Sequence, residues 1–197
     1  MTTLDNSSNT SSKLDQALDQ FIDNWCQHQR HHSPQSMSIE YDSQWPSACY
    51  SDSQQLMDGE LCQWQPERQQ HQDMFSRLAD ALDEAVHPDI VTFYSRYWST
   101  HLPATSDEGD LELLQVWNQD DMERLRSNLL GHALAKRKLK QPLSFFIALT
   151  YPDEGMLCVD NNSGEIWYEM PGKKPIRKIA DSLCTFLSRI KPAVTDN

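Results

Sequence analysis

The sequence predicts an α+β protein with a single folded domain, in which helices pack on one side of a largely antiparallel or mixed sheet. One reason is length, since 197 residues fit one domain with a sizeable core. A second is the helical spacing of apolar residues towards both ends of the chain. A third is the run of short apolar segments between residues 144 and 169, which turn sequences separate.

The first expected element is an amphipathic helix from about Ser12 to Gln29, because apolar residues recur there at helical spacing. Its apolar stripe consists of Leu14, Ala17, Leu18, Phe21, Ile22 and Trp25. Residues 1–12 are rich in Ser, Thr and Asn and have little to bury, so a disordered polar tail is expected there. The folded domain is therefore expected to cover residues 13–197.

Prolines interrupt the next part of the chain, where only short strands are expected, at Cys49–Ser51 and Glu60–Trp64. A helix is expected from about Gln70 to Ala85, and the His-Pro dipeptide that follows should end it. The segment Ile90–Trp98 is rich in β-branched and aromatic residues, and either a strand or a short buried helix fits it.

A strand is expected at Leu111–Trp117, followed by a helix that starts near Asn118. Asp120 and Asp121 fall in its first turn, where carboxylates interact favourably with the helix dipole. Gly131 is expected to end this helix, because glycine is the commonest residue just past a helix C-terminus.

The last third of the sequence predicts a three-stranded meander with strands at Ser144–Thr150, Met156–Asp160 and Glu165–Glu169. A final helix is expected at about Ile176–Ile190, from the spacing of its apolar residues. The stretch His132–Lys140 has no decisive pattern.

The charge of the chain favours a basic partner. The formal net charge is −12, so nucleic acid and anionic lipid would be repelled. Residues 1–135 carry 22 acidic and 7 basic side chains, whereas residues 136–197 carry 7 acidic and 10 basic ones. The acidic surface is therefore expected in the first two thirds of the chain.

Two groups of carboxylates are candidates for contact with such a partner. The first group, at a spacing of four on one face of the first helix, is Asp15, Asp19 and Asp23. The second group, just before the strand at residue 111, is Asp107, Glu108 and Asp110. Charge reversal of either group should weaken binding, although a solvated surface without a partner also fits these residues.

Catalytic, metal and cofactor sites are not expected. The five cysteines are widely spaced and form no CxxC pair, which is typical of reduced thiols. The stretch from Cys26 to His32 contains Cys and His residues but lacks the ligand spacing of a zinc site. No nucleophile-elbow, zinc-protease or phosphate-loop motif is present. His132 could serve as a base, but a structural histidine is favoured.

The sequence also limits how the chain could contact a membrane. Its polar first residues lack the apolar core of a signal peptide, so a cytoplasmic location is expected. The longest apolar stretch, Leu143–Leu149, is too short to span a bilayer. The basic stretch Lys136–Lys140 could touch lipid headgroups or nucleic acid, but in so acidic a chain a solvated or acid-paired stretch is favoured.

The stretch LELLQVWNQDDMERLRSNLLGHALAKRKLKQPLSFFIAL, which begins at Leu111, resembles the signature region of the Syd family of SecY-interacting proteins. The match is carried by Leu114–Trp117, the Asp-Asp pair, Asn128–His132, Lys136–Lys140 and Phe146–Ala148, with Asn162–Glu165 downstream. The resemblance runs from the first helix to the last and departs in residues 27–62 and in the polar start.

This resemblance implies an α+β domain of the SUKH superfamily type without enzymatic activity. It implies peripheral attachment to the cytoplasmic side of the inner membrane, where a negatively charged concave surface binds basic cytosolic loops of SecY. The motif residues are Trp117, Asp120, Asp121, Asn128, Gly131 and His132. They are expected to have a structural role, in starting and ending the helix and in fixing the position of the next segment. The alternative is a related binding module with another basic target, such as a toxin that an immunity protein neutralises.

Overall fold

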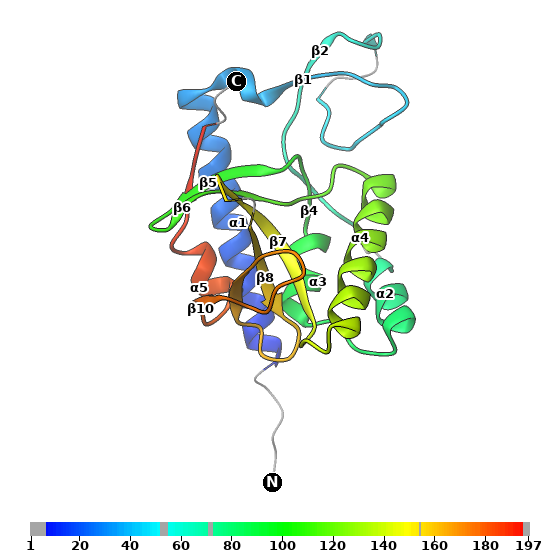
Figure 1. The fold of residues 1–197 in the computed structure, drawn as a ribbon. Helices are drawn as coiled ribbons and strands as arrows, with labels where there is room; N and C mark the ends of the chain where they lie inside the picture. The colour runs from blue at the N-terminus through cyan, green and yellow to red at the C-terminus, as the bar shows by residue number, and fades with distance from the viewer. Residues whose placement is uncertain (1–6, 52–54, 71–72, 154, 195–197) are drawn as a thin grey trace.

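A curled antiparallel sheet forms the centre of the molecule in the computed structural model, which describes residues 7–51, 55–70, 73–153 and 155–194 (Figure 1). The sheet has seven strands within the described residues. In spatial order they are β10 (Arg177–Ala180), β9 (Ile166–Glu169), β8 (Met156–Asp160), β7 (Ser144–Tyr151), β6 (Gly109–Leu113), β5 (Leu102–Ser106) and β11 (Lys191–Pro192). Each neighbouring pair is antiparallel.

Two smaller antiparallel pairs lie outside this sheet. The strands β1 (Ser38–Glu40) and β2 (Leu61–Gln63) pair above it in Figure 1, next to the short 3-10 helix η1 (Pro34–Met37). The strands β3 (Glu67–Arg68) and β4 (Tyr97–Trp98) form the other pair.

The helices and the sheet share one hydrophobic core. The helices are α1 (Ser7–His32), α2 (Met74–Leu82), α3 (Pro88–Ser95), α4 (Gln119–Lys138) and α5 (Leu183–Leu187). Every one of them contributes buried apolar side chains to the same cluster as strands β5 to β9. The predicted α+β class with a largely antiparallel sheet is therefore confirmed. Within the described residues, no helix is long and apolar enough to cross a membrane.

Helix α1 confirms the first predicted element, and its predicted apolar stripe is buried except for Ala17, which is partly buried. The helix starts at Ser7, earlier than the predicted Ser12, and the first six residues of the predicted tail lie outside the described residues. The predicted meander is also confirmed, as β7, β8 and β9 pair in sequence order. Its second turn contains Gly164 at φ +75°, where a Cβ atom would lie 2.7 Å from the His87 ring.

Two predictions about helices are wrong. Helix α4 continues through Gly131 to Lys138, because Ala133 and Lys136 extend its buried face by another turn and a half. The predicted helix Ile176–Ile190 is instead the strand β10, the short helix α5 and the strand β11. The backbone of β10 pairs with β9, and the Ser182 side chain accepts a hydrogen bond from the Thr185 amide, so the helix starts only there.

The remaining differences concern short segments. The predicted strand at Leu111–Trp117 ends at Leu113, and Val116 forms only an isolated bridge with Trp98. The segment Ile90–Trp98 contains both expected alternatives, the end of α3 and then β4. The predicted strand at Cys49–Ser51 is reduced to one bridge between Tyr50 and Trp64, whereas β2 confirms the strand next to it.

The helix predicted at Gln70–Ala85 is shorter in the structure, where α2 covers Met74–Leu82 and residues 71–72 lie outside the described residues. Its predicted apolar face is buried, and it packs against α4.

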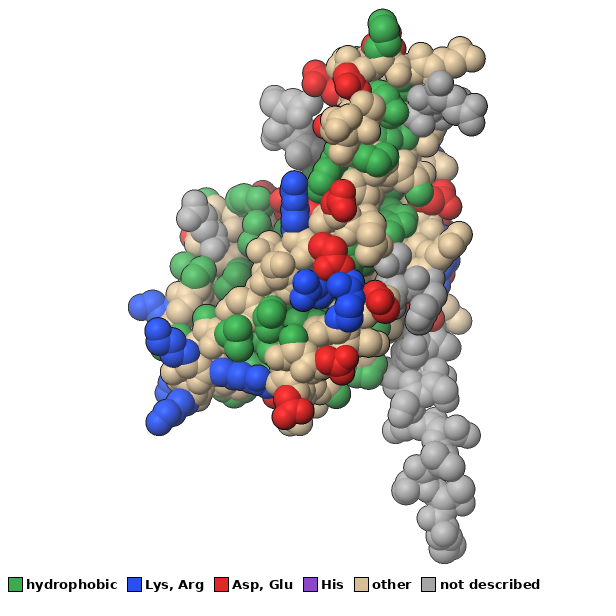
Figure 2. All heavy atoms as spheres, turned by 90° about the vertical axis from the view of Figure 1, so that its right-hand side faces the viewer, with side chains coloured by type: hydrophobic (Ala, Val, Ile, Leu, Met, Phe, Trp, Pro, Cys, Tyr) green, Lys and Arg blue, Asp and Glu red, His purple; other side chains and the backbone are tan. Residues whose placement is uncertain are grey.

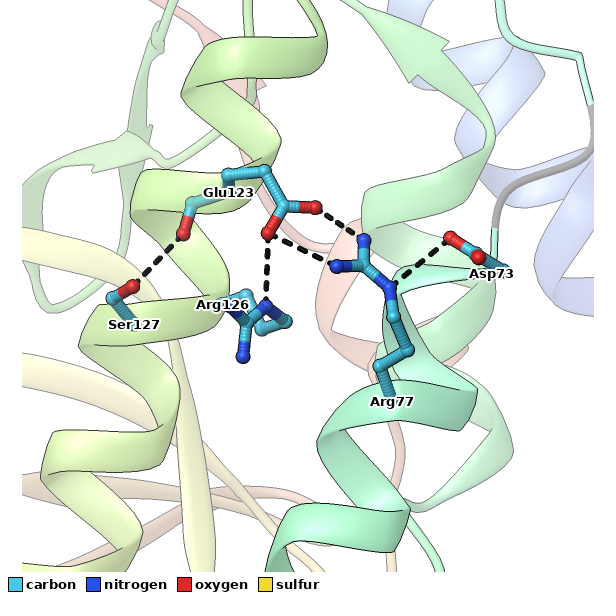
Figure 3. Close-up of polar contacts among 5 residues, drawn as sticks. All are labelled: Asp73, Arg77, Glu123, Arg126 and Ser127. Atoms are coloured by element: carbon cyan, nitrogen blue, oxygen red, sulfur yellow. Dashed lines mark hydrogen bonds and ion pairs between the residues drawn. The ribbon is translucent and has the colours of Figure 1, made fainter.

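Helices α2 and α4 are also joined by a polar network around Glu123 (Figure 3). Arg77 of α2 donates to both carboxylate oxygens, with Nη1 at 3.2 Å from Oε2, and Arg126 Nε donates to Oε2 at 2.9 Å. Arg77 Nε also donates to Asp73 Oδ1 at 3.3 Å, and Ser127 Oγ donates to the Glu123 carbonyl at 3.1 Å. The hydrogen bonds from the two arginines lower the pKa of Glu123, Arg77 most strongly, so the carboxylate stays charged.

Candidate functional site

A broad concavity lies between the β1–β2 pair and the start of α4. It consists of a cavity of about 590 Å³ and a neighbouring one of about 310 Å³, which share Thr100 and His101. We call these two cavities together the acidic groove. Its name comes from the carboxylates that line it, which are Glu40, Asp42, Asp58, Glu112 and Asp121.

Carboxylates dominate the charge of the groove lining, and the Arg124 guanidinium lies against the lining residue Trp45, with Cζ 4.2 Å from the ring centroid. No lysine or arginine lines either cavity in the described chain, and His101 is the sole titratable group that could become cationic there. None of the five carboxylates forms an ion pair with a described lysine or arginine. A concave surface lined by one sign of charge concentrates the electric field and attracts ligands of the other sign.

Aromatic side chains form a continuous row along the groove. The ring centroids of Tyr41 and Tyr50 lie 5.1 Å apart, and those of Tyr50 and Trp117 also lie 5.1 Å apart. The row continues from Trp117 to Trp64 at 5.8 Å and from Trp64 to Trp25 at 5.9 Å. Burial raises the pKa of the Tyr50 phenol, which therefore stays neutral at physiological pH.

Hydrogen bonds hold the groove-forming loop 41–50 against the residues before α4. Ser47 Oγ donates to the Trp117 carbonyl at 2.6 Å, and Asn118 Nδ2 donates to the Pro46 carbonyl at 2.8 Å. The loop therefore has a fixed position relative to helix α4, although it contains no helix and no long strand.

The start of α4 has a reciprocal cap. The Asp121 amide donates to Asn118 Oδ1 at 2.9 Å, and the Trp117 amide donates to Asp121 Oδ2 at 2.9 Å. The predicted helix start at Asn118 is thereby confirmed, with Asp120 exposed in the first turn. Trp117 and Asp121 also line the acidic groove, which the structural role predicted for them did not include.

The first predicted group of carboxylates lies on α1, outside the acidic groove. Arg96 Nε and Nη2 donate to the two carboxylate oxygens of Asp19 at 2.7 Å each, and Arg96 Nη1 donates to Asp15 Oδ1 at 2.5 Å. Arg68 Nη2 is a further partner of Asp19 at 2.7 Å. The hydrogen bonds from Arg96, followed by those from Arg68 and Tyr97, lower the pKa of Asp19 to about 2.

The third member of this group, Asp23, is exposed and makes no ion pair with a described residue. Two of the three carboxylates thus already bind arginines within the chain. Their contact with a partner stays a prediction.

The second predicted group lies at the β5–β6 hairpin, where Asp107, Glu108 and Asp110 are exposed. Glu108 forms an ion pair with Arg177. Glu108 and Asp110 border a separate cavity of about 170 Å³ that shares no lining residue with the acidic groove. The role of this group in binding likewise stays a prediction.

The remaining motif residues lie along α4. Asn128 and Gly131 are exposed, whereas His132 is half-buried and its ring lies edge-on to Phe146. His132 Nε2 is buried and has no hydrogen-bond partner among the described residues. Burial, and then the charge of Lys136, lower the pKa of His132, so the ring stays neutral.

Beneath His132 lies a buried ion pair that the sequence did not reveal. Lys136 Nζ donates to Glu169 Oε1 and Oε2 at 2.8 and 2.7 Å and to Ser144 Oγ at 2.6 Å. Lys136 is 4% exposed, so the first residue of the basic stretch 136–140 belongs to the core and pairs with an acid there.

This cluster also contains the one group of metal-type ligands in the described chain, since atoms of His132, Cys158 and Glu169 lie within 4.8 Å of one another. The Lys136 ammonium already neutralises the Glu169 carboxylate, and burial raises the pKa of the Cys158 thiol far above its ordinary value. In this network the Lys136 ammonium group is the cation that binds the Glu169 carboxylate.

Sequence reasoning missed the groove carboxylates Glu40, Asp42 and Asp58, which lie in the part of the chain where the Syd resemblance departs. The available signal was local. Two acidic and two aromatic side chains fall between Glu40 and Trp45, and aromatic residues are enriched at binding faces.

Comparison with known proteins agrees with the resemblance. The family model described as Syd protein (SUKH-2) matches residues 15–192. Protein Syd of Pseudoalteromonas atlantica is 40% identical over 186 residues, which cover 94% of this chain and 100% of the relative. Protein Syd of Alteromonas mediterranea is 38% identical over 175 residues, which cover 89% of this chain and 94% of the relative. Protein Syd of Colwellia psychrerythraea is 36% identical over 190 residues, which cover 92% and 94%. The chain belongs to the Syd family.

Proposed function

We propose that this chain is a binding protein without catalytic activity, which docks on the basic cytosolic loops of SecY at the cytoplasmic side of the inner membrane. The acidic groove is the docking surface. Relatives named Protein Syd at 36–40% identity over most of the chain support the partner. Cytosolic loops of membrane proteins are enriched in lysine and arginine, which supports the charge match.

The observation that carries this proposal is the composition of the groove, which combines five carboxylates with an aromatic row and no lining lysine or arginine in the described chain. Buried aromatic rings supply binding energy at the centre of an interface, and surrounding charges select and steer the partner. In Figure 2, acidic side chains lie on the upper lobe, and Lys and Arg side chains lie mainly lower on the body.

The direct test is capture of detergent-solubilised SecY complex on this protein at increasing salt concentration. Binding should fade as salt rises, because charges on the groove rim are screened over about 8 Å at physiological ionic strength. An absence of binding at low salt would refute the proposal. The partner would then be another basic protein, as expected of an immunity-like module.

The location of the surface is tested by two variants that remove the same charge. The groove variant is Glu40→Gln, Asp42→Asn and Asp58→Asn, and the hairpin variant is Asp107→Asn, Glu108→Gln and Asp110→Asn. The amide replacements retain a hydrogen-bond acceptor, which Asp58 needs to accept from the Ser43 amide. The groove variant should bind about tenfold more weakly, mainly through slower association. An equal or larger loss in the hairpin variant would contradict the groove as the docking surface.

A further inference from the structure

The wall of the larger cavity holds two polar side chains that lack a hydrogen-bond partner among the described residues. Gln115 lines this cavity and is 5% exposed. Its side-chain amide makes no hydrogen bond to any described residue, whereas its backbone amide donates to His101 Nδ1 at 3.1 Å. Close to it, Ser99 lines the same cavity, and its buried hydroxyl is likewise without a described partner. The Ser99 hydroxyl is buried and unpaired among the described residues, so a ligand that reaches it and the Gln115 amide gains hydrogen bonds there.

The walls of this cavity suit a flat cation. The rings of Tyr50 and Trp117, which both line the cavity, meet nearly at right angles, at 85°, so aromatic surface borders it in more than one orientation. A guanidinium group already contacts an aromatic ring at this site, since Arg124 Cζ lies 4.2 Å from the centroid of the Trp45 ring.

The charges around the cavity are uncompensated. Among the described residues, Asp42 and Asp58 accept hydrogen bonds only from the loop residues Gln44 and Ser43. Each carboxylate therefore keeps free lone pairs for an additional donor. A cation in the cavity would meet negative charge on several sides without displacing a lysine or arginine from the lining.

We propose that the larger cavity of the groove holds one arginine side chain of the bound loop. The guanidinium stacks against the aromatic rings, donates to the Gln115 carbonyl oxygen, and faces the carboxylates with its remaining N–H groups. Lysine fits less well, because an ammonium group is strongly hydrated and lacks a planar face for stacking. The identity of the partner rests on the proposed function, whereas the preference for arginine rests on the cavity alone.

The test uses the full chain and blocked five-residue Gly/Ser peptides with one central arginine, lysine or citrulline. Binding is followed through the indole N–H signals of Trp45 and Trp117 in ¹H–¹⁵N NMR spectra. The arginine peptide should bind about fivefold more tightly than the lysine peptide. The citrulline peptide, which keeps the shape but not the charge, should bind more weakly than both. Equal affinity for arginine and lysine would overturn the inference without any variant.

Gln115 is tested by two substitutions of similar volume. Gln115→Met removes the acceptor, so the arginine and lysine peptides should then bind within about twofold of each other. Gln115→Glu keeps an acceptor and should keep the preference. A preference that survives in Gln115→Met would overturn the role of this residue.

Capture of the SecY complex separates this inference from the proposed function. Groove-dependent capture without an arginine preference would refute the inference alone. An arginine preference without capture would refute the proposed function alone.

Discussion

Asp19 is predicted to stabilise the fold, and its replacement by asparagine isolates the contribution of its charge. The carboxylate accepts hydrogen bonds from Arg96, Arg68 and Tyr97, and these lower its pKa from 3.8 to about 2. A neutral asparagine resembles the protonated acid in shape. The difference in free energy of unfolding should therefore correspond to the pKa shift, which amounts to about 2 kcal/mol before solvent screening of this partly exposed group.

Urea unfolding followed by circular dichroism measures this difference. With a slope of about 2 kcal/mol per molar urea, the midpoint of Asp19→Asn should lie about 1 M below that of the wild type. The matched control is Asp23→Asn, on the same helix but exposed and without an ion pair to a described residue. The control should change stability by less than about 0.5 kcal/mol.

The pH dependence provides a second check on Asp19. Because its folded-state pKa is depressed, the stabilisation is fully present above the unfolded value of 3.8 and is lost as pH falls through about 2. The gap between wild type and Asp19→Asn should therefore shrink to about half near pH 3. A gap that is absent at neutral pH, or that widens in acid, would refute the ion-pair argument. Intact stability with weakened capture of SecY would instead assign Asp19 to partner binding.

Three other substitutions test the fold around the site. Gly131→Ala should raise the free energy of unfolding by about 0.5–1 kcal/mol in urea titrations, because Gly131 lies inside α4 with nothing within 4 Å of an added Cβ; a loss of stability would contradict this. Gly164→Ala should lower the thermal midpoint of unfolding, because φ is +75° and the His87 ring lies 2.7 Å from the new methyl group. The expected loss in free energy of unfolding is about 1–3 kcal/mol, and an unchanged midpoint would contradict this prediction. Lys136→Met should cost about 3–5 kcal/mol by leaving Glu169 unpaired, and adding Glu169→Gln should restore part of this in the same urea assay; no rescue would exclude an electrostatic cause.

The sequence predicted those elements whose local pattern fits only one kind of secondary structure. The stripe of α1 and the turn residues of the β7–β9 meander are of this kind. The pattern after Ile176 was ambiguous, because apolar residues at helical spacing also fit a short strand followed by a short helix. Pairing of β10 with β9 decided between the two, and that contact is not visible in the local sequence.

The candidate site was predicted only in part, because its decisive contacts join distant parts of the chain. Asp15 and Asp19 seemed free for a partner, but Arg96 lies 81 and 77 residues further along the chain and binds both. Lys136 seemed to belong to a basic surface stretch, but Glu169, 33 residues away, holds it in the core. Net charge predicted an acidic surface, whereas tertiary ion pairs determine which carboxylates have no lysine or arginine partner among the described residues.

The acidic groove and the capped start of α4 form one structural unit. Asn118 accepts a hydrogen bond from the Asp121 amide within the helix and donates one to the Pro46 carbonyl of the groove loop. Trp117, the neighbouring residue, provides an aromatic wall and accepts a hydrogen bond from Ser47 of the same loop. The loop therefore depends on the helix cap for its position, and a partner that enters the groove meets a surface ordered before binding. In the proposed function, such preorganisation lowers the entropic cost of association with the partner.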